Sequence, residues 1–298
     1  MIFIGATVFR DQLPFFQLYE GKQDTNIQMQ PAPIPNPGVV NIEPPSAANL
    51  YVVLGSDYRP ESGFRTDTIL LVAVDSHSGK ASVVSFPRDL WVSIPGFGEG
   101  RINTIMQMGG FPLFANTLQT NFGVYPTQYV MIDMAGFSQV IDTLGGITFS
   151  TESYTADACD GALDPDRWCE VGPGTVSLDS ELALWYVRAR YNSSDFDRMG
   201  RMQEITKAVF RKVATPTGML KLPQLMSIYE SGVESNIHPN ELSPLARFGL
   251  GFSLEDDVRW YIIGPDFVTS WTTAGGASVL LPNTPAIQAV LNEALTFE

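Results

Sequence analysis

RTDTILLVAVDSHSGKASVVSFPRD, residues 65–89, has the pattern of a β-hairpin. Its two apolar runs, ILLVAV and ASVVSF, are each of strand length, and the turn sequence DSHSGK joins them. Neither run alternates with polar residues, which is typical of strands that are covered on both faces. We therefore expect a β-sheet that is built around this hairpin and has helices above and below it.

A charged pair stands at each outer end of the predicted hairpin: Arg65 with Asp67, and Arg88 with Asp89. Strand residues two apart share a face, so Arg65 and Asp67 are expected to point the same way. A sheet rim with two such pairs is suited to hold an anion together with a metal ion. This hypothesis makes the hairpin a candidate wall of a binding site.

The residues after the hairpin add the elements of an α/β fold. A strand at 129–134, a helix at 135–146 that stops at its glycines, and a strand at 147–150 follow one another. This order is typical of an α/β layer. The fold class we expect is α/β, with a central mixed β-sheet that is covered by helices on both faces.

Other segments supply the covering helices. Residues 103–122 have a helical pattern that is interrupted at Gly109-Gly110, which predicts two helices rather than one. Beyond Thr215 the patterns predict only structural elements: helices at 221–233, 238–252 and 283–295, and a strand at 258–264.

The first 48 residues differ in composition from the rest. MIFIGATVF, residues 1–9, is apolar but about half the length that crosses a bilayer. The Pro-rich stretch QPAPIPNPG at 30–38 is typical of an extended linker. We expect residues 1–48 to be the remnant of a membrane anchor followed by a stalk, and residues 49–298 to form a single domain.

The charge balance limits the function. The net charge of −14 and the pI near 4.5 argue against general nucleic-acid binding, which needs a basic face. Of the 13 arginines, eight fall in the windows 59–101 and 188–201. The guanidinium group binds oxyanions with two prongs, so this clustering indicates phosphate recognition. The alternative is that these arginines only pair with surface carboxylates.

The second window contains Arg188 and Arg190, which follow a helix predicted to begin at 179–187. Two residues are about 200° apart on a helix, but share a face on an extended chain. If both arginines bind one anion, the helix must therefore end near Trp185.

A second helix is expected directly after these arginines. Asp195 is its candidate N-cap, and Arg198 and Arg201, three residues apart, are expected to be neighbours on its first turns. A helix N-terminus with arginines beside it is suited to bind an anion.

The two cysteines, Cys159 and Cys169, lie ten residues apart in a loop-like stretch rich in Asp and Gly. No CxxC motif or histidine cluster accompanies them, so a metal site is not expected. A local disulfide in an oxidising, extracytoplasmic location is the main interpretation, and two free thiols are the alternative. We expect the acidic residues of this stretch to be solvated.

Common catalytic motifs are missing from the sequence: it has no P-loop, no GxGxxG after a strand, no HExxH and no GxSxG. Its two histidines, His77 and His238, are not near the charged clusters, which argues against a Ser-His-Asp hydrolase. Arginines and aspartates without a protein nucleophile suit phosphoryl transfer, in which the protein positions the substrates and a divalent ion neutralises charge.

Seven motifs in order give these charges a context: GSDYR, RTDTILLV, VVSFPRDLWVSIPG, RIN, FxxVIDTLGGI, LALWYVRAR and SDFDRMGRMQ. Over residues 50–212 the chain resembles the LytR-CpsA-Psr family of bacterial cell-envelope glycopolymer ligases. The resemblance implies transfer of a glycopolymer from a polyprenyl-pyrophosphate carrier to a peptidoglycan hydroxyl. It also implies a Mg²⁺ ion, which Mn²⁺ could replace, an apolar groove for the lipid, and an N-terminal membrane anchor that faces outward.

The same resemblance assigns roles to individual residues. It implies that Asp57 and Asp67 bind the Mg²⁺ ion. Asp195 would orient the arginines or take the proton from the acceptor hydroxyl, and Asp89 is a second candidate for the latter role. The catalytic set is then Asp67, Arg88, Asp89 and Asp195.

The resemblance also implies which cations bind the pyrophosphate: Arg65, Arg88, Arg101, Arg188, Arg190, Arg198 and Arg201. Two positions depart from the family pattern, because Arg101 stands where a lysine is usual and Met202 where a glutamine is usual. Two rival functions follow: a polyprenyl-pyrophosphate phosphatase that uses the same site, and a non-catalytic envelope protein that binds the lipid carrier or has a regulatory role.

Overall fold

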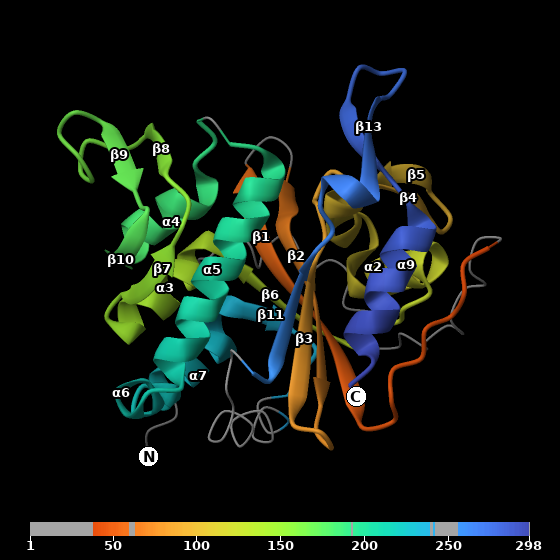
Figure 1. The fold of residues 1–298 in the computed structure, drawn as a ribbon, viewed down its shortest axis with the longest axis horizontal. Helices are drawn as coiled ribbons and strands as arrows, with labels where there is room; N and C mark the ends of the chain where they lie inside the picture. The colour runs from red at the N-terminus through yellow and green to blue at the C-terminus, as the bar shows by residue number, and fades with distance from the viewer. Residues whose placement is uncertain (1–37, 60–62, 192, 239–240, 242–255, 298) are drawn as a thin grey trace, which may run out of the picture.

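A six-stranded mixed sheet forms the centre of the computed structural model, which describes residues 38–59, 63–191, 193–238, 241 and 256–297 (Figure 1). The inner strands β1, β2 and β3 pair antiparallel, whereas β6 and β12 pair parallel to β1 and β3. The strands are, in spatial order, β11 (Val233–Ser235), β6 (Gln128–Asp133), β1 (Ala48–Arg59), β2 (Gly63–Asp75), β3 (Lys80–Ser85) and β12 (Val258–Ile262). The predicted mixed sheet is thus confirmed.

The predicted hairpin is β2 and β3. Asp75 pairs with Lys80 at its closed end, and the Asp75 carboxylate accepts hydrogen bonds from the backbone N–H groups of His77 (3.0 Å) and Ser78 (3.1 Å). This is the local bonding by which an aspartate fixes a tight turn.

Helices cover both faces of the sheet, as the apolar runs predicted (Figure 1). On one face, α2 (Ile105–Phe122) and α9 (Thr284–Leu295) form the main core with residues such as Leu54 and Ile69. On the other face lie α3 (Met134–Leu144), α4 (Ser180–Arg188) and α5 (Asp195–Val213). The predicted break in the first helix is confirmed, because Gly109 and Gly110 of α2 have non-helical backbone angles.

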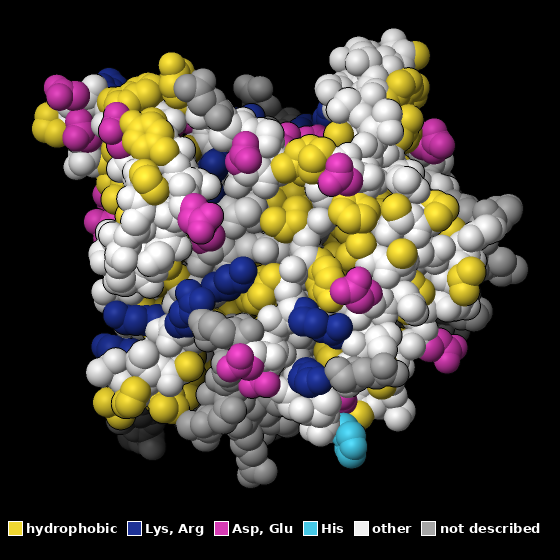
Figure 2. Space-filling view, viewed as in Figure 1, with side chains coloured by type: hydrophobic (Ala, Val, Ile, Leu, Met, Phe, Trp, Pro, Cys, Tyr) yellow, Lys and Arg dark blue, Asp and Glu magenta, His cyan; other side chains and the backbone are white. Residues whose placement is uncertain are grey.

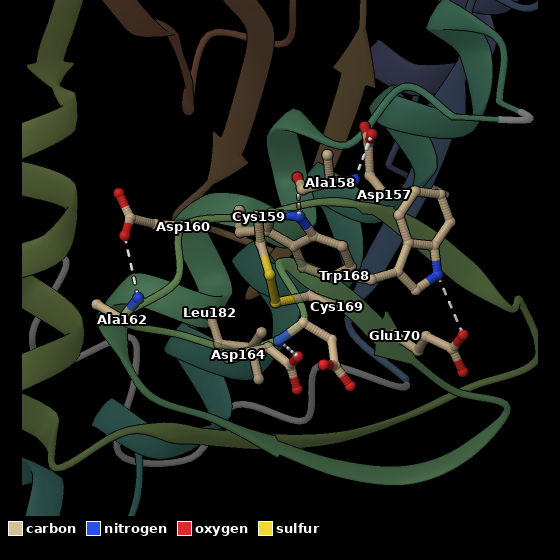
Figure 3. The surroundings of a disulfide bond; sticks show 12 residues. Asp157, Ala158, Cys159, Asp160, Ala162, Asp164, Trp168, Cys169, Glu170 and Leu182 are labelled. Carbon is tan, nitrogen blue, oxygen red and sulfur yellow. Dashed lines mark hydrogen bonds between the residues drawn. A yellow bond between two sulfur atoms is a disulfide. The ribbon is translucent and has the colours of Figure 1, made fainter.

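A second core joins α3, α4 and α5 to the antiparallel pair of β7 (Ile147–Thr151) and β10 (Gly174–Leu178). Above it stands the hairpin of β8 (Thr155–Ala158) and β9 (Trp168–Val171). Figure 3 shows the Cys159–Cys169 disulfide beside this hairpin, which confirms the predicted pairing.

Two further hairpins lie on the other side of the molecule: β4 (Trp91–Ile94) with β5 (Gly98–Arg101), and β13 (Val268–Thr272) with β14 (Ser278–Pro282). The strands β13 and β14 were not predicted from sequence, although Gly275-Gly276 between two β-rich runs is a hairpin signal. This hairpin projects from the upper edge in Figure 1.

The domain begins earlier than predicted. The side chain of Gln288 in α9 donates a hydrogen bond to the carbonyl of Val40 (2.6 Å), and the backbone N–H of Ile42 donates to the carbonyl of Gly123 (2.8 Å). Residues 40–42, which were expected to belong to the stalk, therefore pack on the helices. The predicted anchor remnant and most of the predicted linker lie outside the described residues.

The C-terminal predictions have mixed outcomes. The strand β12 and the helices α7 (Leu222–Gly232) and α9 are present, and α6 (Pro216–Met219) precedes α7. Most of the predicted helix at 238–252 lies outside the described residues. Among the described helices, none is long and apolar enough to cross a bilayer.

Candidate active site

A cavity of about 1340 Å³ separates the sheet from α3, α4 and α5. Along β2 it runs from Asp67 to Val74, a distance of about 23 Å at roughly 3.3 Å per residue. Most of its lining is apolar, and representative residues are Val53, Leu70, Val72, Val83, Val130, Phe137, Ile205, Val209 and Trp260. The cavity is therefore a long, mostly apolar pocket between the sheet and the helices.

The charged residues that line the pocket include acids near the end of β1 and the start of β2 and arginines from α4, α5 and the loop between them: Asp57, Asp67, Arg188, Arg190 and Arg198. Figure 2 shows charged side chains of both signs on the floor of a notch between two projections, the hairpins β8–β9 and β13–β14. The structure thus brings the sheet-side acids and the helix-side arginines to one pocket.

A β-bulge places Asp67. Gly55 of β1 pairs with Thr68 and Ser56 pairs with Thr66, so Asp67 is the extra residue between them. The bulge interrupts the regular alternation of side chains along β2. The prediction that Arg65 and Asp67 share a face rested on that alternation, so its reasoning was wrong. Both Asp67 and Thr68 line the pocket. Bulges often redirect side chains beside active sites, and this one has that effect.

Arg65 lies one step outside the pocket. It is the direct partner of Asp57 across β1 and β2, so the two side chains leave the same face of the sheet. Among the described residues, the pocket lining includes Asp57 but not Arg65.

Arg88 is the centre of an ionic network. Its Nη1 lies 2.9 Å from Asp67 Oδ2, its Nη2 lies 3.4 Å from Asp195 Oδ1, and its Nε lies 3.4 Å from Asp89 Oδ2. The same Asp195 oxygen lies 2.5 Å from Nη1 of Arg198. Asp195 therefore joins the arginine of the sheet to the arginine of α5.

The surroundings of the network shift the pKa values of its two arginines. Burial would lower the pKa of Arg88, but Asp67, Asp195 and Asp89 together outweigh burial and raise it. For Arg198 the balance is reversed, because burial and the nearby Arg88 and Arg190 lower its pKa despite Asp195. The Nε of Arg198 is also buried without a hydrogen-bond partner among the described residues. A buried, unmatched donor beside other cations favours binding of an anion.

Arg188 and Arg190 line the pocket together, but for a different reason than expected. The helix α4 ends at Arg188 and not near Trp185. Ala189 then leaves the helical conformation (φ −53°, ψ 137°), so the two arginines flank a non-helical residue. Residues on either side of such an extended position can project toward the same side.

Asp157 holds this loop in place. Its Oδ2 accepts hydrogen bonds from the backbone N–H groups of Arg190 (2.6 Å) and Tyr191 (3.2 Å). Partial burial would raise the pKa of Asp157, but these bonds and the N–H of Ala158 hold it below its ordinary value. The sequence analysis treated Asp157 as a solvated acid, and no local pattern separates it from the other aspartates of the stretch.

The disulfide hairpin supports Asp157. Figure 3 shows Asp157 and Ala158 immediately before Cys159, and the indole N–H of Trp185 donates to the carbonyl of Ala158 (3.1 Å). Cys159 and Leu163 belong to the pocket lining. The hairpin is therefore a wall of the pocket as well as a support for the arginine loop.

Arg201 does not bind in the pocket, which corrects its predicted role. It is only 4% exposed, and its guanidinium donates to the backbone carbonyls of Tyr186 (2.9 Å) and Ala189 (2.5 Å). These bonds close the turn between α4 and α5. Arg201 thus fixes the backbone on which Arg188 and Arg190 stand.

The start of α5 also differs from the prediction. Ser194 is the N-cap and forms a capping box with Asp197, so Asp195 is the first residue of the helix. The Asp195 carboxylate therefore does not cap the helix and instead binds Arg88 and Arg198.

Arg101 lies behind the pocket. Its Nε is 3.2 Å from Asp89 Oδ1, and its Nη2 donates to the carbonyl of Ser278 in β14 (2.6 Å). Among the described residues that line the pocket, Arg101 is absent. Its predicted contact with pyrophosphate is replaced by a contact with Asp89, which Arg101 and Arg88 hold from two sides.

The acids of the pocket fit a divalent ion that is shared with a substrate. Asp57 and Asp67 supply two carboxylates. Within the described part of the chain, no group of three or more His, Cys, Asp or Glu could hold a metal ion. Mg²⁺ is commonly bound by one or two carboxylates together with substrate phosphates and water, so this donor set fits such a site.

Comparisons with known proteins identify relatives of the chain. Regulatory protein MsrR of Staphylococcus aureus is 28% identical to the chain over 242 residues, which are 80% of this chain and 68% of that protein. The polyisoprenyl-teichoic acid–peptidoglycan teichoic acid transferase TagU of Oceanobacillus iheyensis is 28% identical over 208 residues, which are 65% of this chain and 60% of that protein.

Solved structures share the fold. Bacillus subtilis TagV superposes with a TM-score of 0.69 at 23% identity, over 84% of this chain and 98% of that chain. TagT bound to LIIa-WTA gives a TM-score of 0.67 at 22% identity, over 86% and 92% of the two chains. The LytR_cpsA_psr family model matches residues 19–293, which is most of the chain. The chain therefore belongs to the LytR_cpsA_psr family.

Proposed function

We propose that this protein transfers a glycopolymer from a polyprenyl-pyrophosphate carrier to a peptidoglycan hydroxyl, at the extracytoplasmic face of the cell membrane. The observation that carries the proposal is an arginine cluster at one end of a long apolar pocket. The name of the relative TagU, a polyisoprenyl-teichoic acid–peptidoglycan teichoic acid transferase, supports the same class of donor and acceptor.

The apolar pocket would hold the lipid tail. Burial of hydrocarbon contributes about 0.8 kcal/mol per CH₂ group, so a polyprenyl chain supplies ample affinity without the charged residues. Binding energy from this remote part of the substrate leaves the arginines to act mainly on the transition state.

The pyrophosphate would lie between the two walls of the pocket. Arg188, Arg190 and Arg198 approach it from the helix side, and Arg88 from the sheet side. A Mg²⁺ ion, which Mn²⁺ could replace, would be held by Asp57 and Asp67 and would neutralise charge on the phosphate oxygens. The guanidinium groups stabilise the charge that develops as the bond to the lipid phosphate breaks.

The two remaining acids have different positions and therefore different proposed roles. Asp195 lies between Arg88 and Arg198 and orients them. Asp89 lies at the Nε of Arg88, away from the Nη atoms that face Asp67 and Asp195, and is the candidate base. The acceptor oxygen attacks the phosphorus that carries the glycan, its proton passes to Asp89, and the polyprenyl phosphate leaves.

Product analysis tests this function. The purified chain is incubated with a polyprenyl-pyrophosphate-linked glycan, peptidoglycan and Mg²⁺. We expect polyprenyl phosphate to be released and the glycan to become joined to peptidoglycan through a phosphodiester. Release of unlinked glycan phosphate would instead show a phosphatase, and donor binding without turnover would show a binding or regulatory protein.

A further inference from the structure

An aromatic pair lies beside Arg101 of the ionic network, because Trp91 is the direct strand partner of Arg101. Trp271 of β13 is 43% exposed and packs edge-to-face on Trp91 of β4, with ring centroids 6.3 Å apart. The indole N–H of Trp91 donates to Glu99 (3.2 Å), which fixes the supporting ring. The projecting hairpin thus presents a large, oriented aromatic surface to solvent.

The hairpin that carries Trp271 is connected to Asp89. The backbone N–H of Leu280 in β14 donates to the Asp89 carbonyl (3.0 Å). Arg101 binds the Asp89 carboxylate and the carbonyl of Ser278 at the same time. The position of the β13–β14 hairpin is therefore coupled to the candidate base by three contacts.

The direction of attack in the proposed reaction indicates which substrate approaches the aromatic surface of Trp271. In phosphoryl transfer the attacking and leaving oxygens lie roughly in line through the phosphorus. The leaving lipid phosphate stays with its tail on the pocket side, so the attacking hydroxyl comes from the opposite side. Asp89, Trp91 and Trp271 are absent from the described lining of the pocket, and Asp89 joins the network through Arg88 and Arg101. The acceptor would enter over this hairpin.

We propose that Trp271, supported by Trp91, is a stacking platform for a sugar ring of the acceptor glycan strand. This inference rests on the proposed function, because it assigns the second substrate of the same reaction to a place. The C–H face of a pyranose ring packs on the electron-rich face of an indole, and this contact orients the sugar without a charge. The platform would hold the acceptor hydroxyl near Asp89.

The donor also carries sugars, so the experiment has to distinguish binding of the acceptor glycan from binding of the donor glycan. A second exposed aromatic pair, Trp168 with Tyr191, lies on the β8–β9 side, with ring centroids 4.9 Å apart. Trp168 is 38% exposed, close to the value for Trp271, and Tyr191 directly follows Arg190. Trp168→Ala is therefore a control that removes a comparable exposed indole from the other side of the network.

Calorimetric titration of the whole chain with soluble peptidoglycan glycan-strand oligomers tests the platform. We expect Trp271→Ala to weaken binding about tenfold, or ~1.4 kcal/mol. Trp271→Phe should retain most of the affinity, and Trp168→Ala all of it. Unchanged melting temperatures show that the variants are folded. Equal affinity of Trp271→Ala and wild type, or no binding by wild type, would overturn the platform.

Two further measurements assign the source of the sugar and separate the platform from the proposed function. Titration with the soluble glycopolymer of the donor should show no effect of Trp271→Ala, and a larger loss there than with peptidoglycan oligomers would overturn the acceptor assignment. In the transfer assay, Trp271→Ala should raise the KM for peptidoglycan and leave kcat unchanged. Failure of wild type to join glycan to peptidoglycan would refute the proposed function, whereas normal transfer with an unchanged KM in Trp271→Ala would refute only the platform.

Discussion

The two walls of the pocket hold their arginines by different means. On the sheet side, Arg88 lies beside the described lining of the pocket, in a small adjoining cavity that it shares with Asp67 and Asp195. Its side chain is fixed there by three carboxylates, those of Asp67, Asp89 and Asp195. On the helix wall, no ion pair joins Arg190 to a described carboxylate, and its backbone is fixed by Asp157 instead. Arg198, also on the helix side, is paired with Asp195. Charge thus fixes Arg88 and Arg198, whereas the backbone of a loop positions Arg188 and Arg190, which are exposed.

This difference has a consequence for mutation. Neutralising a carboxylate on the sheet wall changes the charge and the direction of Arg88 at once. Removing Asp157 on the helix side releases the backbone that positions Arg190, and none of the described ion pairs of the clustered arginines is lost. We therefore expect the largest effects on the sheet side.

Asp67→Asn should have the largest effect. It removes the closest partner of Arg88 and one of the two proposed Mg²⁺ ligands, so we expect turnover to fall about 100-fold or more. The Mg²⁺ concentration that gives half-maximal activity should also rise. Both values come from the transfer assay at a series of Mg²⁺ concentrations.

Asp75→Asn is the matched control, because Asp75 lies on the same strand but binds only the hairpin turn in the contacts described here. It should cost about 1 kcal/mol of stability and leave turnover unchanged. If both variants lost turnover equally, the effect of Asp67 would be structural.

Asp157→Ala should have an intermediate effect. It releases the backbone N–H groups of Arg190 and Tyr191, and a misplaced binding group lowers turnover, here by about tenfold. Asp157→Asn keeps one acceptor oxygen and should restore part of the rate. The control is Asp164→Ala in the same hairpin loop, and a similar loss in that variant would contradict a positioning role for Asp157.

Removal of the disulfide should have the smallest effect on turnover. In Cys159→Ser/Cys169→Ser the hairpin that carries Asp157 is no longer closed, so we expect a decrease of only a few-fold. The chain-entropy estimate for a loop of this length gives a loss of about 2–3 kcal/mol in stability. Thermal melts measure the loss of stability, and transfer assays measure the loss of turnover. Both are carried out on the oxidised wild type, the reduced wild type and the variant. A larger effect than that of Asp157→Ala would show that the hairpin acts on the site by another route.

The same contrast explains what could be predicted from sequence. The hairpin of β2 and β3, the break in α2 and the charged ends of the strands follow from local patterns, and all are present. The bulge at Asp67 has no such signature, because it depends on how β1 pairs with β2.

The helix wall was less predictable for a physical reason. Periodicity places Arg198 and Arg201 near each other on α5 but does not tell which of them turns toward α4, and Arg201 is the one that is buried. The end of α4 depends on Asp157 and Arg201, which contact residues 189–191 from outside that helix. Long-range contacts of this kind leave no mark in a local sequence window.

The kinetic parameters of Arg88→Ala test the central claim most directly, namely that the arginine network acts on the transition state while the apolar pocket binds the lipid. Arg211→Ala, an exposed arginine farther along α5, is the control for loss of a positive charge. We predict that kcat of Arg88→Ala falls about 100-fold or more and that KM for the lipid-linked donor stays close to the wild-type value. A raised KM with an unchanged kcat would contradict the account.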